Sequence, residues 1–381
     1  MNRGSASPVR TVLMTADAVG GVWSYAVQLS ERLARRGLSV VLATMGPAPT
    51  DGQRRALAAL GIGHVHGDFR LEWMPGAAAD RREAEDWLLD LERRHRPDIV
   101  HLNGYCHGAA PFAAPKLVVA HSCVLSWWHA VHGEVPPADW DGYGLAVSGG
   151  LREADAVVAP TAAFLELLEG LYGRLPHASV IHNGRGPDGF GPAHEKEPVI
   201  LCAGRLWDQA KNIGSLDEIA PDLAWPVLVA GDDRAPDGRL AASSHLQALG
   251  RLDEATLARW MGRASVFVSP ARYEPFGLAV LEAALSGCAL VLGDIPSFRE
   301  LWDDAALFVD PDDGKGLHDA LNRIIRDAEL RAKLAAAARG RGLSFPADRM
   351  ADDTLALYRR LAASRQPVFA EAGPAALEAG G

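Results

Sequence analysis

Cysteine is scarce in this sequence of 381 residues, and the four that occur, Cys106, Cys123, Cys202 and Cys288, are far apart. Their spacing contains no C-x-x-C pair and no Cys/His pattern that is typical of a zinc site. Isolated cysteines of this kind are expected to be reduced thiols in a core. The beginning of the chain also lacks the pattern of an export signal, so the sequence favours a cytoplasmic protein.

Long hydrophobic runs and an excess of positive charge are missing too. No apolar stretch of about 18 residues occurs, which excludes a membrane-spanning helix. Lys and Arg total 38 against 48 Asp and Glu, and the net charge of −10 disfavours a nucleic-acid-binding surface. Arginine pairs such as Arg35 and Arg36 fall on polar helix faces, which leaves peripheral contact with a membrane open.

Short apolar runs that alternate with segments of helical periodicity are what the chain does contain. At roughly 100 to 200 residues per domain, the length predicts two domains. The alternation predicts crossover units and mostly parallel sheets, that is, an α/β fold of two doubly wound, Rossmann-like domains. In the first half we expect strands at residues 9–16, 39–46, 98–102, 116–120, 156–159 and 179–182, and helices at 22–36, 81–95 and 162–172.

The segment at residues 184–198 is rich in glycine and proline, has no apolar periodicity and is interpreted as the interdomain linker. Ligands of open α/β sheets bind outside the carboxyl ends of the strands, so two such sheets predict one interdomain cleft. Strands are expected after the linker at residues 199–204, 226–231, 265–270, 289–294 and 306–310, and final helices at 314–326, 329–338 and 349–363.

The most informative motif is RYEPFGLAVLEAALSGCALVLGD, which follows a predicted strand. Glu274 ends a loop, Pro275, Phe276 and Gly277 form a turn, and a helix begins at Leu278. Free N–H groups at a helix start favour a diphosphate. Glu282 lies inside the helix, and its carboxylate is an acceptor that suits the two adjacent hydroxyls of a ribose.

This motif resembles the signature of the retaining glycosyltransferases of family 4, and the resemblance extends over residues 10–362. It implies a GT-B fold with an acceptor domain at residues 1–186, a nucleotide-sugar domain at 187–345, a helix at 346–364 that returns to the first domain, and a flexible tail at 365–381. It further implies that Glu274 contacts the transferred sugar, that Pro275, Phe276, Gly277 and Leu278 line the sugar and phosphate, and that Glu282 binds the ribose.

A second motif, CAGRLWDQAKN, follows the first strand after the linker. Arg205 and Lys211 bracket its loop, and two cations there can neutralise a diphosphate that gains charge as the glycosidic bond breaks. The pair resembles the phosphate-binding Arg and Lys of the family, although Lys211 follows Arg205 by six positions here instead of five. With Glu274 and His121, which follows a first-domain strand, these two cations form the predicted catalytic set.

Other predicted contacts come from the loops of both halves. Gly20 and Gly21 match the glycine loop that lies near the donor in the family, and Arg251 and Leu252 match residues that line the base pocket. Asn103, Tyr105 and Trp127 are predicted to face the acceptor.

The predicted reaction is transfer of a hexosyl group from a nucleotide-diphospho-sugar, with UDP as the expected nucleotide, to an acceptor hydroxyl. We expect retention by same-face attack, with the diphosphate as leaving group and without a cofactor or metal ion, as is general for the fold. The alternative is a GT-B epimerase or phosphorylase that uses the same cleft.

Overall fold

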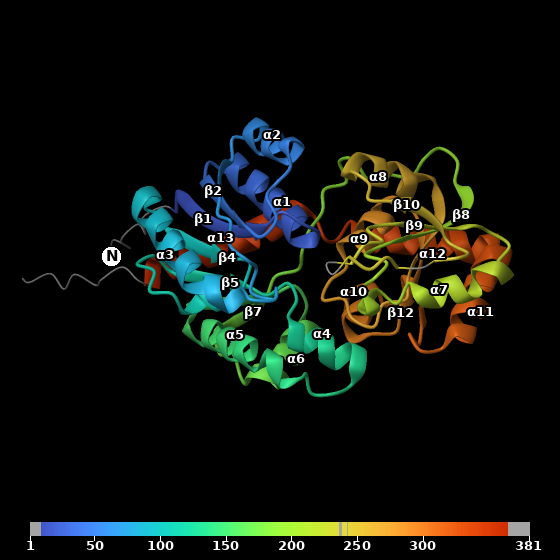
Figure 1. The fold of residues 1–381 in the computed structure, drawn as a ribbon. Helices are drawn as coiled ribbons and strands as arrows, with labels where there is room; N and C mark the ends of the chain where they lie inside the picture. Colours follow the sequence, from blue (N-terminus) through green and yellow to red (C-terminus); the bar gives the residue numbers. More distant parts are fainter. Residues whose placement is uncertain (1–8, 236–237, 242, 365–381) are drawn as a thin grey trace, which may run out of the picture.

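Two α/β units stand side by side in the computed structural model, which describes residues 9–235, 238–241 and 243–364 (Figure 1). The predicted tail at residues 365–381 lies outside the described residues. The first unit, blue to green in Figure 1, holds seven strands, and the second, yellow to orange, holds six. Within the described ranges, no helix is long and apolar enough to span a membrane.

The first sheet is parallel throughout, with the strand order β3-β2-β1-β4-β5-β6-β7. The order reverses direction at β1, which places a switch point between β1 and β4, where ligands of such sheets bind. The strands are β1 (Thr11–Asp17), β2 (Ser39–Met45), β3 (Gly63–His66), β4 (Ile99–Leu102), β5 (Lys116–Val119), β6 (Ala156–Ala159) and β7 (Ala178–Val180).

The second sheet is also parallel, with the order β10-β9-β8-β11-β12-β13 and a switch point between β8 and β11. Its strands are β8 (Glu197–Ala203), β9 (Val227–Ala230), β10 (Gln247–Gly250), β11 (Ala264–Ser269), β12 (Ala289–Gly293) and β13 (Ala306–Val309). The prediction of two doubly wound parallel-sheet domains is therefore confirmed, although the edge strands β3 and β10 had not been predicted.

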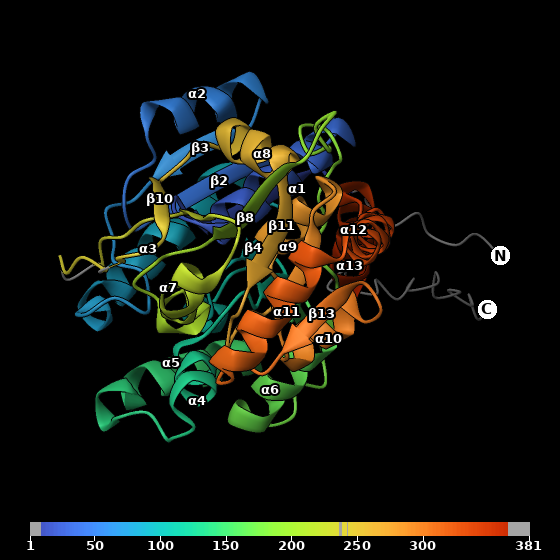
Figure 2. The same cartoon turned by 90° about the vertical axis from the view of Figure 1, so that its right-hand side faces the viewer.

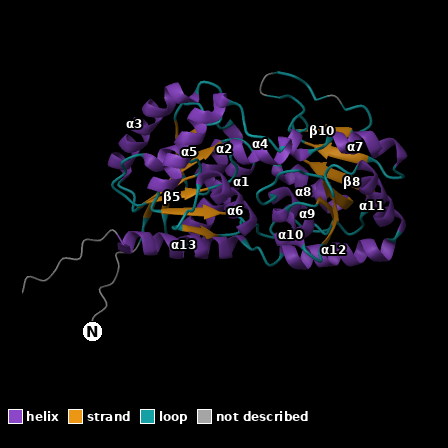
Figure 3. Ribbon diagram, turned by 90° about the horizontal axis from the view of Figure 1, so that it is seen from below, coloured by secondary structure: helices purple, strands orange, loops and turns teal. Residues whose placement is uncertain are grey.

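Helices cover both faces of each sheet, as Figure 3 shows. Successive strand side chains point to opposite faces, so Leu13 joins one core cluster while Val12 and Met14 join another. The helices are α1 (Gly21–Arg35), α2 (Asp51–Ala59), α3 (Ala77–His95), α4 (Val124–His132), α5 (Asp141–Glu153), α6 (Ala162–Tyr172), α7 (Gly214–Ile219), α8 (Glu254–Arg263), α9 (Leu278–Leu285), α10 (Pro296–Trp302), α11 (Gly314–Arg326), α12 (Ala328–Gly342) and α13 (Ala347–Ser364).

The last described helix belongs by its contacts to the first unit. Helix α13, red in Figure 1, packs beside α1, and its residues Met350, Leu355, Tyr358 and Leu361 are buried in the core that α1 shares with the first sheet. In Figure 2, which looks along the line between the units, α12 and α13 overlap, whereas Figure 3 shows α12 on the second unit and α13 on the first, where the chain passes back. The chain thus connects the two units twice.

Candidate active site

The loop between β11 and α9 carries the Glu274 motif to the carboxyl end of the second sheet. Gly277 caps α9 at φ 87°, and a Cβ atom there would lie only 3.0 Å from the Phe298 ring. Only glycine fits both this conformation and this close approach. The Ser297 hydroxyl donates to the Glu274 carbonyl oxygen at 2.5 Å and fixes the loop from α10. The first N–H groups of α9 are therefore held beside Glu274.

Lys211 and Glu274 are brought together as an ion pair, with Lys211 Nζ 2.5 Å from Glu274 Oε2. Lys211 ends a short 3₁₀ turn, η3 (Gln209–Lys211), that follows the Arg205 loop. Arg205 lies nearby and half exposed, with Nη2 2.6 Å from Asp208 Oδ2 and its guanidinium over the Trp207 ring. Each predicted phosphate-binding cation thus has a carboxylate partner in its own domain.

Asp208 also joins the two domains, and sequence reasoning had not selected it. Its Oδ1 accepts a hydrogen bond of 3.0 Å from Trp127 Nε1 on α4, in the first domain. Burial raises the pKa of Asp208, but Arg205, the Trp127 hydrogen bond and Lys211 outweigh burial and leave the pKa below its ordinary value. Trp127, predicted to face the acceptor, is therefore held against the loop that carries Arg205 and Asp208.

A chain of neutral polar groups lies at the switch point of the first sheet. Asn103 Oδ1 lies 2.7 Å from His121 Nε2 and 3.2 Å from His101 Nε2, and His101 Nδ1 lies 2.5 Å from the Tyr358 hydroxyl. Asn103 Nδ2 donates to the Thr15 carbonyl oxygen at 2.7 Å. Two predicted site residues, His121 and Asn103, are thus in direct contact.

These contacts determine which ring nitrogens carry protons. Because Asn103 Oδ1 can only accept, both histidines donate to it from Nε2. His101 Nδ1 then accepts from Tyr358, and the unprotonated Nδ1 of His121 is an acceptor. Burial lowers the pKa of His101 to about 4, and burial together with His101 lowers that of His121 to about 3. Both rings are neutral at pH 7.

Tyr273 brings the Glu274 loop against the His121 loop. Although it belongs to the second domain, Tyr273 is buried in the core of the first. Its hydroxyl lies 2.7 Å from Ser126 Oγ and 3.2 Å from Ser122 Oγ, and it accepts from the Cys123 N–H at 3.3 Å. Since Glu274 follows Tyr273 and Ser122 follows His121, this tyrosine brings the two loops together across the domain boundary.

The glycine loop faces the start of α9 in the second domain. A Cβ atom on Gly21 would lie 3.9 Å from Leu278 Cδ1, across the domain boundary, and Gly20 has φ 73° at the start of α1. Asp17, at the end of β1, was not identified from the sequence. Burial raises its pKa to about 6, against the opposing effects of the Val19 N–H and of Arg205 in the other domain.

Glu282 lies apart from this group, on the buried side of α9. Its Oε1 is 2.9 Å from Arg185 Nε, and its side chain is 9% exposed. Burial raises the pKa of Glu282 to about 7, although Arg185 opposes this rise and Glu254 adds to it.

The remaining predicted donor contacts lie in two other places. Arg251 and Leu252 follow β10 and precede Asp253, the N-cap residue of α8. Pro275 accepts at its carbonyl from the Thr161 hydroxyl at 2.9 Å, and Phe276 is buried in the core.

Tyr105 does not face the cleft as predicted. It is 2% exposed in the core of the first domain, and its hydroxyl donates to the Ser122 carbonyl oxygen at 3.0 Å. Its position after a strand and a glycine suggested a binding loop, but the loop turns inward because Glu72 accepts from the N–H groups of Tyr105 and Cys106.

Among the side chains described by the structure, no three His, Cys, Asp or Glu groups converge as metal ligands.

Comparison with known proteins decides the family. Residues 19–188 match the family described as "Glycosyltransferase Family 4", and residues 197–327 match "Glycosyl transferases group 1". A phosphatidyl-myo-inositol mannosyltransferase of Mycolicibacterium smegmatis is 37% identical over 350 residues, which cover 84% of this chain and 85% of that protein. The chain belongs to glycosyltransferase family 4. The prediction from the Glu274 motif is confirmed, and the protein is an enzyme of the glycosyltransferase class.

Other relatives of this glycosyltransferase carry different names. A glycogen synthase of Mycobacterium tuberculosis is 27% identical over 391 residues, which cover 91% of this chain and 92% of that protein. Among solved structures, a sucrose-phosphate synthase of Thermosynechococcus elongatus superposes with a TM-score of 0.77 at 19% identity, covering 93% of this chain and all of that one. Anabaena HepE in complex with UDP and glucose gives 0.72 at 16% identity, over 92% and 99% of the two chains. These structures confirm the GT-B fold.

Proposed function

We propose that this glycosyltransferase moves a hexosyl group from a nucleotide-diphospho-sugar to an acceptor hydroxyl and retains the anomeric configuration. The observation that carries the proposal is the contact of Tyr273 with Ser122 and Cys123, which brings the Glu274 loop against the His121 loop. Two cations, a helix start and the side chains of Glu274, His121 and Asn103 are thereby gathered at the boundary between the domains. These are the groups needed for a diphosphate leaving group and for a sugar.

Binding of the donor exchanges partners within the site. The diphosphate would pair with the cationic side chains of Arg205 and Lys211 in place of Asp208 and Glu274, their partners in the structure. Glu274, released from Lys211, becomes an acceptor for sugar hydroxyls. The N–H groups at the start of α9 provide further positive potential at the phosphate. The Nδ1 atom of neutral His121 would accept a hydrogen bond from a sugar hydroxyl.

The reaction then breaks the bond between the anomeric carbon and the phosphate oxygen and forms a bond to the acceptor oxygen on the same face. The proton of the acceptor hydroxyl passes to the departing phosphate oxygen. Same-face attack is favoured because Glu274 serves as a hydroxyl contact beside Lys211 and is not placed as a free nucleophile. Arg205 and Lys211 would stabilise the charge that develops on the leaving group, the largest electrostatic demand of the step.

UDP is the proposed nucleotide, and the hexose is left to experiment. UDP occupies the structure of Anabaena HepE, which shares the fold. A thermal-shift panel of UDP, GDP, ADP and dTDP identifies the base. NMR of the sugar released from the matching donor, with water as acceptor, then gives the anomeric configuration before it equilibrates.

Two variants test the assignment of roles. Arg205→Ala and Glu282→Ala are expected to lower donor turnover strongly, whereas Lys315→Ala, an exposed cation on α11, leaves it unchanged. Unchanged turnover in the first two variants, or a product with inverted configuration, would contradict the proposal. Formation of an epimer from the nucleotide-sugar alone, or of a sugar phosphate from an oligosaccharide and free phosphate, would favour the alternative GT-B chemistry.

A further inference from the structure

Arg185 is a charged residue of the linker that is almost completely buried. It follows Asn183 and Gly184, where the chain leaves the first domain, and its side chain is 7% exposed. A buried guanidinium is strongly destabilising unless it is paired. Because Arg185 lies between the two domains, groups around the linker must compensate its charge.

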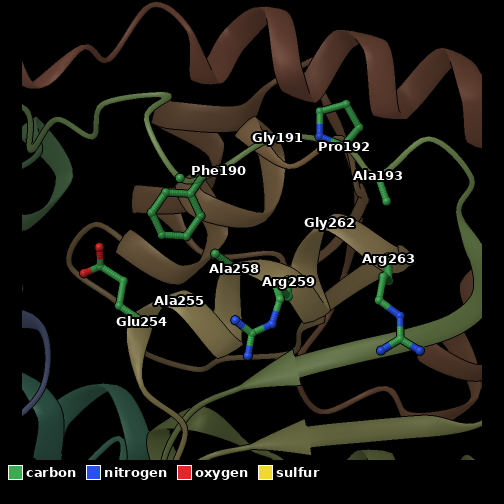
Figure 4. Close-up of a pocket in the computed structure, with 11 residues that line it drawn as sticks. Phe190, Gly191, Pro192, Ala193, Glu254, Ala255, Ala258, Arg259, Gly262 and Arg263 are labelled. Carbon is green, nitrogen blue, oxygen red and sulfur yellow. The ribbon is translucent and has the colours of Figure 1, made fainter.

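The partners of Arg185 come from both domains. Its Nη1 donates to Gln28 Oε1 on α1 at 3.0 Å, its Nη2 lies 2.5 Å from Glu254 Oε2 on α8, and its Nε lies 2.9 Å from Glu282 Oε1 on α9. The guanidinium carbon is 4.9 Å from the centre of the Phe190 ring. Phe190 and Glu254 lie at one end of an open hollow of about 660 Å³ beside the linker (Figure 4).

The contact with Glu282 is electrostatic rather than an aligned hydrogen bond. Although Nε is 2.9 Å from the carboxylate, it has no aligned acceptor among the described groups. A carboxylate offers about four acceptor positions on two oxygens. Arg185 can therefore counter the charge of Glu282 while both carboxylate oxygens of Glu282 keep lone pairs for the adjacent hydroxyls of a ribose.

Glu282 needs such a counter-charge. Burial and the neighbouring Glu254 both raise the pKa of Glu282, and Arg185 is the group that lowers it. Of the charged side chains that the structure describes, Arg185 from the linker and Glu254 from α8 are the ones that act on it. Without Arg185 the carboxyl would be protonated at neutral pH, and a carboxylic acid accepts fewer hydrogen bonds than a carboxylate.

We propose that Arg185 is the positioning residue of the ribose subsite, because it holds Glu282 as a charged acceptor for the 2′- and 3′-hydroxyls of a nucleoside diphosphate. The inference rests on the proposed function, in which Glu282 binds the ribose. It adds that the linker itself contributes to donor binding. Through Gln28 the same guanidinium also contacts the first domain.

The test compares a nucleoside diphosphate with its 2′-deoxy form by calorimetry. The probe is UDP, or the member of the thermal-shift panel that binds in its place. In the unchanged protein we expect the 2′-deoxy ligand to bind at least about tenfold more weakly, since a hydrogen bond to a charged group is lost. In Arg185→Met the ribose ligand should bind about tenfold more weakly at pH 7, and the ratio between the two ligands should fall below about threefold.

The pH dependence separates charge from packing. In Arg185→Met the ratio should rise again towards about pH 9, as Glu282 ionises without the arginine. Arg259→Met is the matched control, because this exposed arginine of α8 lines the same hollow and donates to the Thr256 hydroxyl. It should bind both ligands as the unchanged protein does.

The outcomes distinguish the two levels of the proposal. If the unchanged protein binds no nucleoside diphosphate, or does not distinguish the 2′-deoxy form, the proposed role of Glu282 fails. If it does distinguish them and Arg185→Met keeps the same ratio at pH 7, the role of Arg185 is refuted. A reduced ratio in Arg185→Met that does not change with pH would also refute it, because lost packing would then be the cause.

A second variant covers the case in which Arg185→Met does not fold. Glu254 is 63% exposed, so Glu254→Gln should fold, and it removes the negative neighbour of Glu282. The ratio should decline below about pH 7 in the unchanged protein and at a lower pH in Glu254→Gln. A ratio that is equal and constant in both proteins from about pH 5.5 to about pH 8 would contradict the proposal.

Discussion

The two walls of the cleft use different kinds of polar group. The wall from the second domain presents ion pairs that remain accessible, with Arg205 50% and Lys211 23% exposed. The wall from the first domain presents the half-buried His121 and Asn103, which are joined to the buried His101 and Tyr358 in a neutral chain. Accessible charges can change partners when an anion arrives, whereas the neutral chain keeps fixed donor and acceptor positions. The charged wall is therefore suited to an anion such as phosphate, and the neutral wall to holding hydroxyls in a fixed orientation.

The largest effect should come from the charged wall. Replacing Lys211 by Ala removes a cation at the leaving group, and we expect kcat for donor hydrolysis to fall about 10²- to 10³-fold, the usual cost of losing one charge-stabilising group. Steady-state kinetics with Lys315→Ala as control would measure this. A fall in affinity alone, with kcat unchanged, would mean that Lys211 binds the ground state and does not act on the leaving group.

On the neutral wall, His121→Ala should lower kcat about 100-fold, because a fixed acceptor beside the sugar is lost. The pH profile of kcat in the unchanged enzyme should show no ionisation of His121 between pH 5 and pH 8. Since burial and His101 lower the pKa of His121 to about 3, its ring stays neutral from pH 8 down to pH 5. An acid limb near pH 6.5 that disappears in His121→Ala would show that the ring titrates and would contradict this distinction between the walls.

Stability against pH provides a third test, through His101. Its folded pKa of about 4 lies below the ordinary value of 6.5, so the unfolded chain binds more protons once the pH falls below about 6.5. The stability that comes from the neutral ring is therefore complete above that pH and is lost as the pH falls towards 4. Between pH 7 and pH 5 we expect the free energy of unfolding to fall by about 2 kcal/mol more than in His101→Gln.

Chemical unfolding of both proteins at the two pH values measures this difference. The raised pKa values of Asp17 and Glu282 act in the opposite direction, because protonation stabilises them in the folded state, but they are common to both proteins. The comparison with the variant therefore isolates His101. Equal losses in the two proteins would mean that the buried ring accepts a proton without unfolding.

The smallest effect concerns the contact between the walls. Tyr273→Phe removes the hydroxyl that reaches Ser126, Ser122 and Cys123, and the cost of about 1 kcal/mol should appear as a five- to tenfold fall in kcat. Nucleoside diphosphate affinity, measured by calorimetry, should change little. Tyr172→Phe is the matched control, because that hydroxyl contacts Cys123 within the first domain. If both variants lose the same activity, closure of the domains is not what Tyr273 provides.

Much of this architecture could be predicted from the sequence because buried parallel strands are continuous apolar runs. Two of the four edge strands were missed for the same reason: β3 has the sequence GHVH and β10 the sequence QALG, each only four residues long and partly exposed. Pairing at one side only places little constraint on their composition. They form strands because β3 pairs with β2 and β10 pairs with β9.

The site residues divide in a similar way. Glu274, Arg205, Lys211 and His121 stand in local motifs with a chemical logic, whereas Arg185, Asp208 and Tyr273 acquire their roles only through packing between distant segments. Asp208 looks like an ordinary turn residue until Trp127 is placed against it. Tyr105 was assigned to the acceptor because a strand end usually faces the ligand, but a buried carboxylate draws that loop into the core.

The hydrogen bond between Tyr358 and His101 has a consequence for how the protein is made. The two residues are 257 positions apart, so the first domain leaves the ribosome without the helix that completes its core and its polar chain. The core of the first domain therefore stays incomplete while the whole second domain is synthesised. We therefore expect folding of the first half to end after that of the second, and a chain that stops before α13 would have a complete second domain beside a first domain that lacks part of its core.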